Sequence, residues 1–90
     1  MLARRSRLSI VVSVLRALEG SGVPASRICE RANLPYDRLS KILEKLEEEG
    51  LVSCERKGRA RVYRITEKGA RELKMLEKAY LILRRLGLDA

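Results

Sequence analysis

The stretch Arg31-Ala32-Asn33-Leu34-Pro35-Tyr36-Asp37-Arg38-Leu39 decides the fold, because it separates two helical patterns by a turn of only a few residues. Asn33 tolerates the left-handed backbone conformation, and Pro35 disfavours helix at the residue before it while suiting the first turn of a new helix. Apolar residues recur at helical spacing over residues 25–32 and again over residues 36–49. Two helices joined so tightly predict a helix-turn-helix.

A further helix precedes this unit. Residues 8–19 carry apolar side chains on two neighbouring faces, namely Leu8, Val11, Val12, Leu15 and Leu18 on one and Ile10, Val14 and Ala17 on the other. A surface helix needs only one apolar stripe. We therefore expect other elements to cover this helix on more than one side.

The pattern changes after Gly50 to two extended runs, residues 51–56 and 60–66, separated by Lys57-Gly58-Arg59. The second run is rich in strand formers, and glycine allows a turn with positive φ, so the two runs predict a β-hairpin with a basic tip. Thr66 is placed to cap a last helix that continues to about Leu86.

Three stretches, residues 31–39, 46–52 and 63–69, resemble the small archaeal winged-helix DNA-binding proteins, a group that includes ten-kilodalton chromatin-type proteins of hyperthermophiles. The fold class predicted is mainly α (α+β), a winged helix-turn-helix with a two-stranded wing and a long C-terminal coiled-coil helix. The resemblance implies a homodimer joined through antiparallel C-terminal helices. We expect one compact unit made of a basic N-terminal arm (1–7), the winged domain (8–66) and the dimerisation helix (67–90).

The last helix carries two apolar stripes that fit a dimer interface. Coiled-coil spacing relates Leu73, Leu76, Tyr80 and Leu83, and a second stripe beside it holds Met75, Ala79, Ile82 and Leu86. One stripe can face the domain's own core and the other a partner, with Ile10 and Val14 of the first helix added to the interface. The alternative is that both stripes pack onto one monomer core.

The formal net charge of +8 resides in two segments. They contain eight basic residues, Arg4, Arg5, Arg7, Arg56, Lys57, Arg59, Arg61 and Arg64, and the other twelve Lys and Arg balance the twelve acids. Such a localised footprint suits a polyanion, because each neutralised phosphate releases counterions. Double-stranded DNA is therefore the expected partner, although a charged hairpin tip can also be a solubilising edge and a basic arm a solvated tail.

Further candidate DNA contacts follow from the helix-turn-helix. The first half of the third helix and its flank present Tyr36, Arg38, Ser40, Lys41 and Lys45, since recognition helices read bases with their N-terminal residues. Ser26 and Arg27 begin the preceding helix, where a phosphate can bind. Asp37 fits either a cytosine contact or the helix dipole.

Other functions find little support in the sequence. The chain has no His, so neither Cys29 nor Cys54 has a His partner, and no phosphate-binding glycine loop is present. We expect no enzyme activity, no metal, no cofactor, no membrane span and no small-molecule effector. The acidic outer face at Glu44 and Glu48 supports an alternative role as a winged-helix protein-interaction module in a larger complex.

Composition and cysteine usage complete the expectations. Many charged residues with no Gln and a single Asn favour a thermophilic source, and the basic footprint favours a cytoplasmic, nucleoid-associated protein. The two cysteines are predicted to be small buried side chains, with a disulfide as the alternative.

Overall fold

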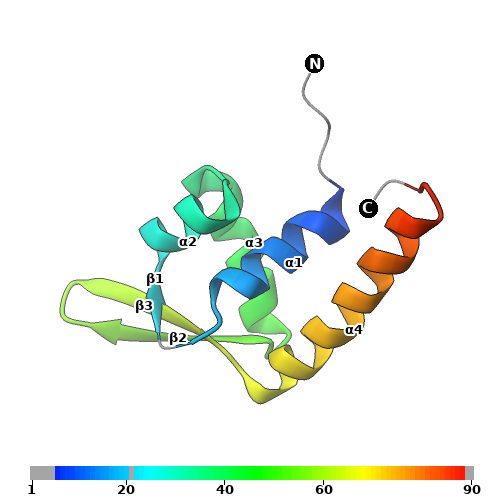
Figure 1. The fold of residues 1–90 in the computed structure, drawn as a ribbon. Coiled ribbons are helices and arrows are strands. Elements are labelled where there is room, and N and C mark those ends of the chain that lie inside the picture. The colour runs from blue at the N-terminus through cyan, green and yellow to red at the C-terminus, as the bar shows by residue number, and fades with distance from the viewer. Residues whose placement is uncertain (1–5, 21, 89–90) are drawn as a thin grey trace.

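The structure is a computed structural model that describes residues 6–20 and 22–88 (Figure 1). In chain order the elements are α1 (Arg7–Ala17), β1 (Val23–Pro24), α2 (Ala25–Ala32), α3 (Tyr36–Glu48), β2 (Val52–Lys57), β3 (Ala60–Ile65) and α4 (Glu67–Arg85). This order is that of a winged helix-turn-helix with a long C-terminal helix, as predicted. All four helices and both wing strands are present, and only their ends differ from the predicted limits.

The strands form a three-stranded antiparallel sheet in the order β1-β3-β2. The two-stranded wing is confirmed, and β1 is an addition that the sequence pattern did not reveal. It pairs Val23 with Tyr63 and Pro24 with Val62. Proline is tolerated here because β1 is an edge strand and needs no further hydrogen bond from that nitrogen. This short strand attaches the base of the wing to the start of α2.

The centre of the hydrophobic core is α1, which explains its two apolar faces. Val12, Val14, Leu15 and Leu18 are each at most 2% exposed. Ile10 is 3% exposed, so it and Val14 lie inside the chain's own core. They have no surface to offer a partner, and our placement of these two residues at a dimer interface is corrected.

Helix α4 packs along α1 and uses its two stripes differently. Leu73 is buried, and Leu76 and Tyr80 pack against the core. An ion pair between Arg16 Nε and Glu77 Oε2, 2.6 Å long, also joins the two helices. Met75 and Leu86 remain 64% and 65% exposed. The alternative in which both stripes pack onto one core is therefore wrong.

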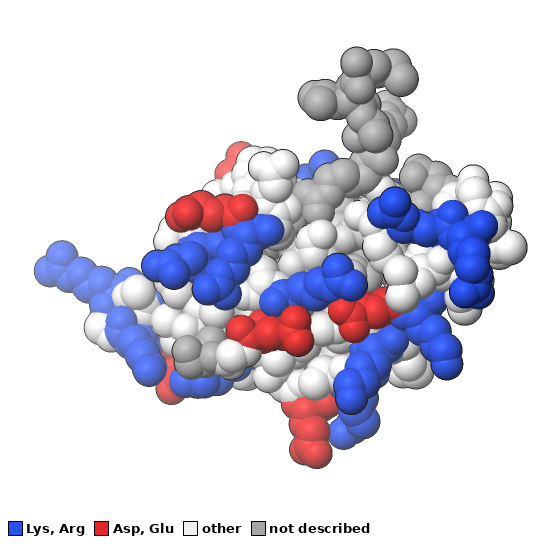
Figure 2. Space-filling view, in the orientation of Figure 1, with Lys and Arg blue, Asp and Glu red and all other residues white. Residues whose placement is uncertain are grey.

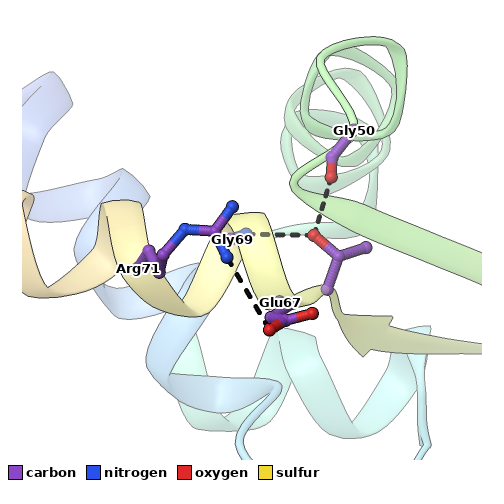
Figure 3. A network of polar contacts seen from close by, with 5 residues as sticks. Gly50, Glu67, Gly69 and Arg71 are labelled. Carbon is purple, nitrogen blue, oxygen red and sulfur yellow. Dashed lines mark hydrogen bonds and ion pairs between the residues drawn. The ribbon is translucent and has the colours of Figure 1, made fainter.

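The wing and α4 meet at Thr66. Its Oγ1 accepts a hydrogen bond from the amide of Gly69 at 3.0 Å, which is the predicted helix cap, and donates to the carbonyl of Gly50 at 2.7 Å (Figure 3). A Cβ at Gly69 would overlap the carbonyl oxygen of Leu51, so this position admits only glycine without a shift of the backbone. The first turn of α4 is thus held tightly against the end of α3.

The cysteine prediction is only partly right. Both Cys29 and Cys54 are free thiols, so the disulfide alternative is wrong within this chain. Both are half-buried and not buried as expected. For Cys54 the reason is its position on β2, directly opposite Tyr63, where the wing begins to extend away from the helical core.

Candidate nucleic-acid interface

The turn of the helix-turn-helix sets the position of α3. Asn33 adopts a left-handed conformation with φ of 55°, and Pro35 in extended conformation precedes the first turn of α3. The inward face of α3 is Leu39, Leu43 and Leu46. Its predicted contact residues point outward: Tyr36 is 61% exposed, and Arg38, Lys41 and Lys45 are also exposed. Ser40 differs, since it is half-buried and its hydroxyl donates to the carbonyl of Asp37.

The wing presents its cations on both faces. Cross-strand partners share a face and successive residues alternate, so Arg56 and Arg61, which are directly paired, lie on the same face as the pair Cys54 and Tyr63. Lys57 belongs to the opposite face. Like charges directly opposite each other in a sheet repel and destabilise it. An anion bound between Arg56 and Arg61 would relieve this repulsion.

A groove brings several predicted contacts together from distant parts of the chain. It has a volume of about 360 Å³ and lies between the wing and the starts of α2 and α3. Its lining includes the predicted residues Ser26, Tyr36, Arg56, Arg59 and Arg61, together with Pro24, Ala25, Ala60 and Tyr63. No Asp or Glu lines it among the residues that the structure describes. The groove is therefore positively charged and its walls carry hydrogen-bond donors.

Tyr63 forms part of this groove and was not among the predicted contacts. It is 9% exposed, and burial raises the pKa of its phenol above the ordinary value, with Cys54 acting in the same direction and Arg61 in the opposite one. The phenol is protonated at neutral pH like that of any tyrosine, and burial extends this neutral state to higher pH. Tyr63 can then act as a neutral hydrogen-bond donor beside Arg61.

The winged helix-turn-helix family matches residues 4–83 of this sequence. The chain belongs to this family. A protein of Archaeoglobus fulgidus is 31% identical over 70 residues, which are 77% of this chain and 74% of that protein.

Two crystal structures share the fold. Sso10a-2, a DNA-binding protein from Sulfolobus solfataricus, superposes with a TM-score of 0.86 at 26% identity over 91% of this chain and 85% of that one. AF1382 from Archaeoglobus fulgidus superposes with a TM-score of 0.69 at 28% identity, over 84% and 85% of the two chains.

Not every predicted contact of this winged-helix chain faces the groove. Arg64 lies on the other face of β3, where its guanidinium is close to Gly22. Arg27 diverges from Ser26 and lines a separate cavity of about 420 Å³ with Glu19 and Arg31. Arg31 is itself held by a 2.9 Å hydrogen bond to the carbonyl of Ala17.

The basic arm of the winged-helix chain is only partly described. Arg4 and Arg5 lie outside the described residues, whereas Arg7 opens α1 and lines a groove with Arg38 and Lys41 of α3. Basic side chains are visible both at the wing end and over α4 (Figure 2).

The last helix of the winged-helix chain and the residues directly after it carry most of the large exposed apolar side chains of the described residues. They are Met75, Leu81, Ile82, Leu86 and the following Leu88, while Leu83 is half-buried and Ala79 exposed. Large exposed apolar surfaces are rare on monomers and mark contact sites. Among the described residues, no helix is long and apolar enough to cross a membrane.

Proposed function

We propose that this chain is a double-stranded DNA-binding protein, acting as a homodimer in transcriptional regulation or in chromatin-type DNA organisation. The observation that carries the proposal is the acid-free groove between α3 and the wing, in which Arg56, Arg59 and Arg61 gather beside the exposed Tyr36. The likeness to Sso10a-2, a DNA-binding protein, supports it. The role is one of binding, without catalysis or a cofactor.

In the proposed complex the start of α3 enters the major groove of DNA. Tyr36, Arg38 and Lys41 then face base edges or the adjoining backbone. The half-buried Ser40, whose hydroxyl donates to the carbonyl of Asp37, would contribute only its oxygen as an acceptor. The wing contacts phosphates or the minor groove, where arginine is favoured by its planar, strongly donating head. Arg56 and Arg61 would hold one phosphate between them, because their mutual repulsion is relieved by a shared anion. Lys45 and Arg27 would add contacts at the edges of the footprint.

The proposed dimer forms through the exposed stripe of α4, which contains Met75, Ala79, Ile82 and Leu86. The core-facing stripe of Leu73, Leu76 and Tyr80 is occupied within each chain, with Leu83 at its half-buried end. A helix of 19 residues has a length of roughly 28 Å at about 1.5 Å per residue. That length is close to one turn of DNA, so two recognition helices can reach successive major grooves on one face.

The proposal is tested by fluorescence anisotropy of two labelled duplexes of unrelated sequence, titrated with the full chain at several salt concentrations. Similar and steeply salt-dependent affinities for both duplexes would support an architectural role at the nucleoid. A preference of a thousandfold or more for one duplex would support a regulator. Absence of binding to either duplex at low salt would contradict the proposed function.

A second candidate is a winged-helix protein-interaction module in a larger complex. The observation in its favour is the acidic C-terminal half of α3, where Glu44, Glu47, Glu48 and Glu49 are all exposed. These carboxylates would repel a duplex placed along the whole helix. Neutralising two of the four by Glu44→Gln with Glu48→Gln should strengthen DNA binding if this half of α3 lies near phosphates, and should leave DNA binding unchanged if this half serves a protein partner.

A further inference from the structure

A second groove lies between α1 and the start of α3, separate from the wing groove. It has a volume of about 280 Å³ and is lined by Arg7, Ile10, Val11, Arg38, Lys41 and Ile42. It shares no lining residue with the groove beside the wing. Among the described residues, no acidic side chain lines it. The lining therefore combines three cations with the half-buried aliphatic side chains Val11 and Ile42, while Ile10 is almost fully buried at 3% exposed.

The aliphatic part of this lining is not explained by DNA. Phosphates interact with Arg7, Arg38 and Lys41 but gain nothing from Val11 and Ile42, which are half-buried and still reachable from the groove. A ligand with an apolar body and one anionic group would use both kinds of side chain. Arginine binds carboxylates through paired, charge-assisted hydrogen bonds, and removal of apolar area from water adds to affinity.

We propose that the groove between α1 and α3 binds a small amphipathic carboxylate, with its apolar body on Val11 and Ile42 and its carboxylate between Arg38 and Lys41. At about 280 Å³ the groove is close to the lower end of the range for ligand sites, about 300–1,000 Å³, which fits a one- or two-ring acid. The sequence pattern indicated no effector because these side chains come from two helices that meet only in the fold.

The ligand would oppose DNA binding, a consequence that rests on the proposed function. Arg38 and Lys41 belong to the proposed DNA contacts, and a carboxylate held between them neutralises charge that a phosphate would otherwise use. Coupling of this kind is reciprocal, so DNA would weaken ligand binding by the same factor. The site itself can be tested on the free protein, where failure of the DNA proposal has no influence.

The first experiment is a titration of the ¹⁵N-labelled full chain with 1-naphthoate, followed by amide chemical shifts without DNA. We expect saturable shifts at the start of α1 and at residues 38–42, and none at the wing tip. The neutral analogue 1-naphthylmethanol should bind at least tenfold more weakly. Equal binding of the acid and the alcohol would overturn the proposal in favour of an apolar contact face, and absence of saturable shifts would overturn the site altogether.

Variants locate the site within the groove. Arg38→Gln with Lys41→Gln should weaken naphthoate by at least tenfold, and Val11→Ser should weaken it severalfold while the folded spectrum is kept. Lys78→Gln, an exposed lysine of α4, is the matched charge control and should leave naphthoate affinity unchanged. Loss of affinity in the control equal to that of the double variant would show a general charge effect and overturn the assignment.

Discussion

The two ends of the molecule expose different chemical groups. At the wing end, the apolar side chains Val62 and Tyr63 are buried and the cations Arg56 and Arg61 face each other across two strands. At the α4 end, exposed cations such as Lys78 and Arg85 accompany large exposed aliphatic side chains, among them Leu81. Closely spaced cations favour the binding of phosphates, whereas an exposed apolar stripe favours burial against another apolar surface. This contrast supports the proposed placement of DNA at the wing end and of a second copy at the α4 end.

The most severe test of this assignment removes the wing charge. Replacing Arg56, Lys57, Arg59 and Arg61 with Ala takes the formal net charge from +8 to +4. We expect DNA affinity to fall on the order of a hundredfold or more, and the salt slope to decrease by up to about 3.6, because each lost phosphate contact contributes about 0.9 to that slope. Anisotropy titrations at several salt concentrations measure both quantities.

A charge-matched variant of the other end serves as the control. Arg71, Lys74, Lys78 and Arg85 are exposed on α4, and their replacement with Ala also gives a net charge of +4. This variant should keep most of the affinity and salt slope. If both variants lose DNA affinity equally, the affinity depends on the total charge of the protein and not on the position of the wing cations.

The apolar end is tested by placing charge on its exposed stripe. Ile82→Glu with Leu86→Glu should leave the fold intact, since both side chains are at the surface, and should weaken a dimer by a hundredfold or more through burial of two carboxylates. Light scattering should then report the 10.2 kDa mass of one chain instead of twice that mass.

Two further variants make this result specific. Ala70→Glu adds a carboxylate at an exposed position of the same helix, outside the stripe, and should leave the dimer mass unchanged. Leu76→Glu places the charge against the core and should unfold the chain. A folded double variant that retains the dimer mass would contradict the proposed interface.

The junction between the two ends is expected to govern stability alone. Thr66→Ala removes the cap of α4 and the hydrogen bond to Gly50, so the free energy of unfolding should fall by about 1–3 kcal/mol. The corresponding decrease in melting temperature is roughly 4–8 °C per kcal/mol for a domain of this size. Thermal unfolding followed by circular dichroism measures the change.

Thr66→Ser keeps the hydroxyl and should recover most of the lost stability. DNA affinity measured well below the melting temperature should be unchanged in Thr66→Ala. A large decrease there would mean that the position of α4 is coupled to the wing, and the two ends would no longer be independent.

Most of the fold could be predicted from local patterns. The helix-turn-helix follows from Asn33 and Pro35, and the wing follows from strand formers on both sides of Gly58, whose φ is +61°. The strand β1 could not be predicted, because two residues show no periodicity and its pairing with Tyr63 depends on the chain returning from far along the sequence. Ile10 and Val14 were misplaced for another reason. A helix with two apolar faces can be covered by its own chain or by a partner, and the spacing of its residues does not distinguish the two.

The sequence indicated which residues the candidate site contains, but not which of them lie together. Charge and helix position indicated Arg56, Arg59, Arg61 and Tyr36, and the fold brings these together. The separation of Arg64 from the groove follows from strand alternation once the pairing of β2 with β3 is known. Tyr63 was missed because a tyrosine in a strand pattern is most often a core residue, and here it both fills the core and lines the groove.

The smallest expected effect is a difference in ionisation between two tyrosines, one at each end of the molecule. Burial raises the pKa of Tyr63 at the wing, whereas a hydrogen bond from Arg84 to its hydroxyl, 3.1 Å long, lowers the pKa of Tyr80 on α4. In an alkaline titration followed by tyrosinate absorbance, Tyr80 should ionise before Tyr63. Tyr80→Phe should remove the early part of the curve and Tyr63→Phe the late part.

The two shifts act on stability with opposite sign. The stability that Tyr63 contributes is fully present below pH 10, its ordinary pKa, and is lost as the pH rises through its raised folded value. The contribution of Tyr80 is present above pH 10 and is lost as the pH falls through its lowered folded value. Arg61→Gln should delay the ionisation of Tyr63 further, because Arg61 favours the phenolate, and Arg84→Gln should delay that of Tyr80. If Arg61→Gln does not change the pH at which Tyr63 ionises, Arg61 does not lie against the phenol of Tyr63. The wing groove would then lack the adjacent guanidinium and hydroxyl donors that we expect to bind an anion.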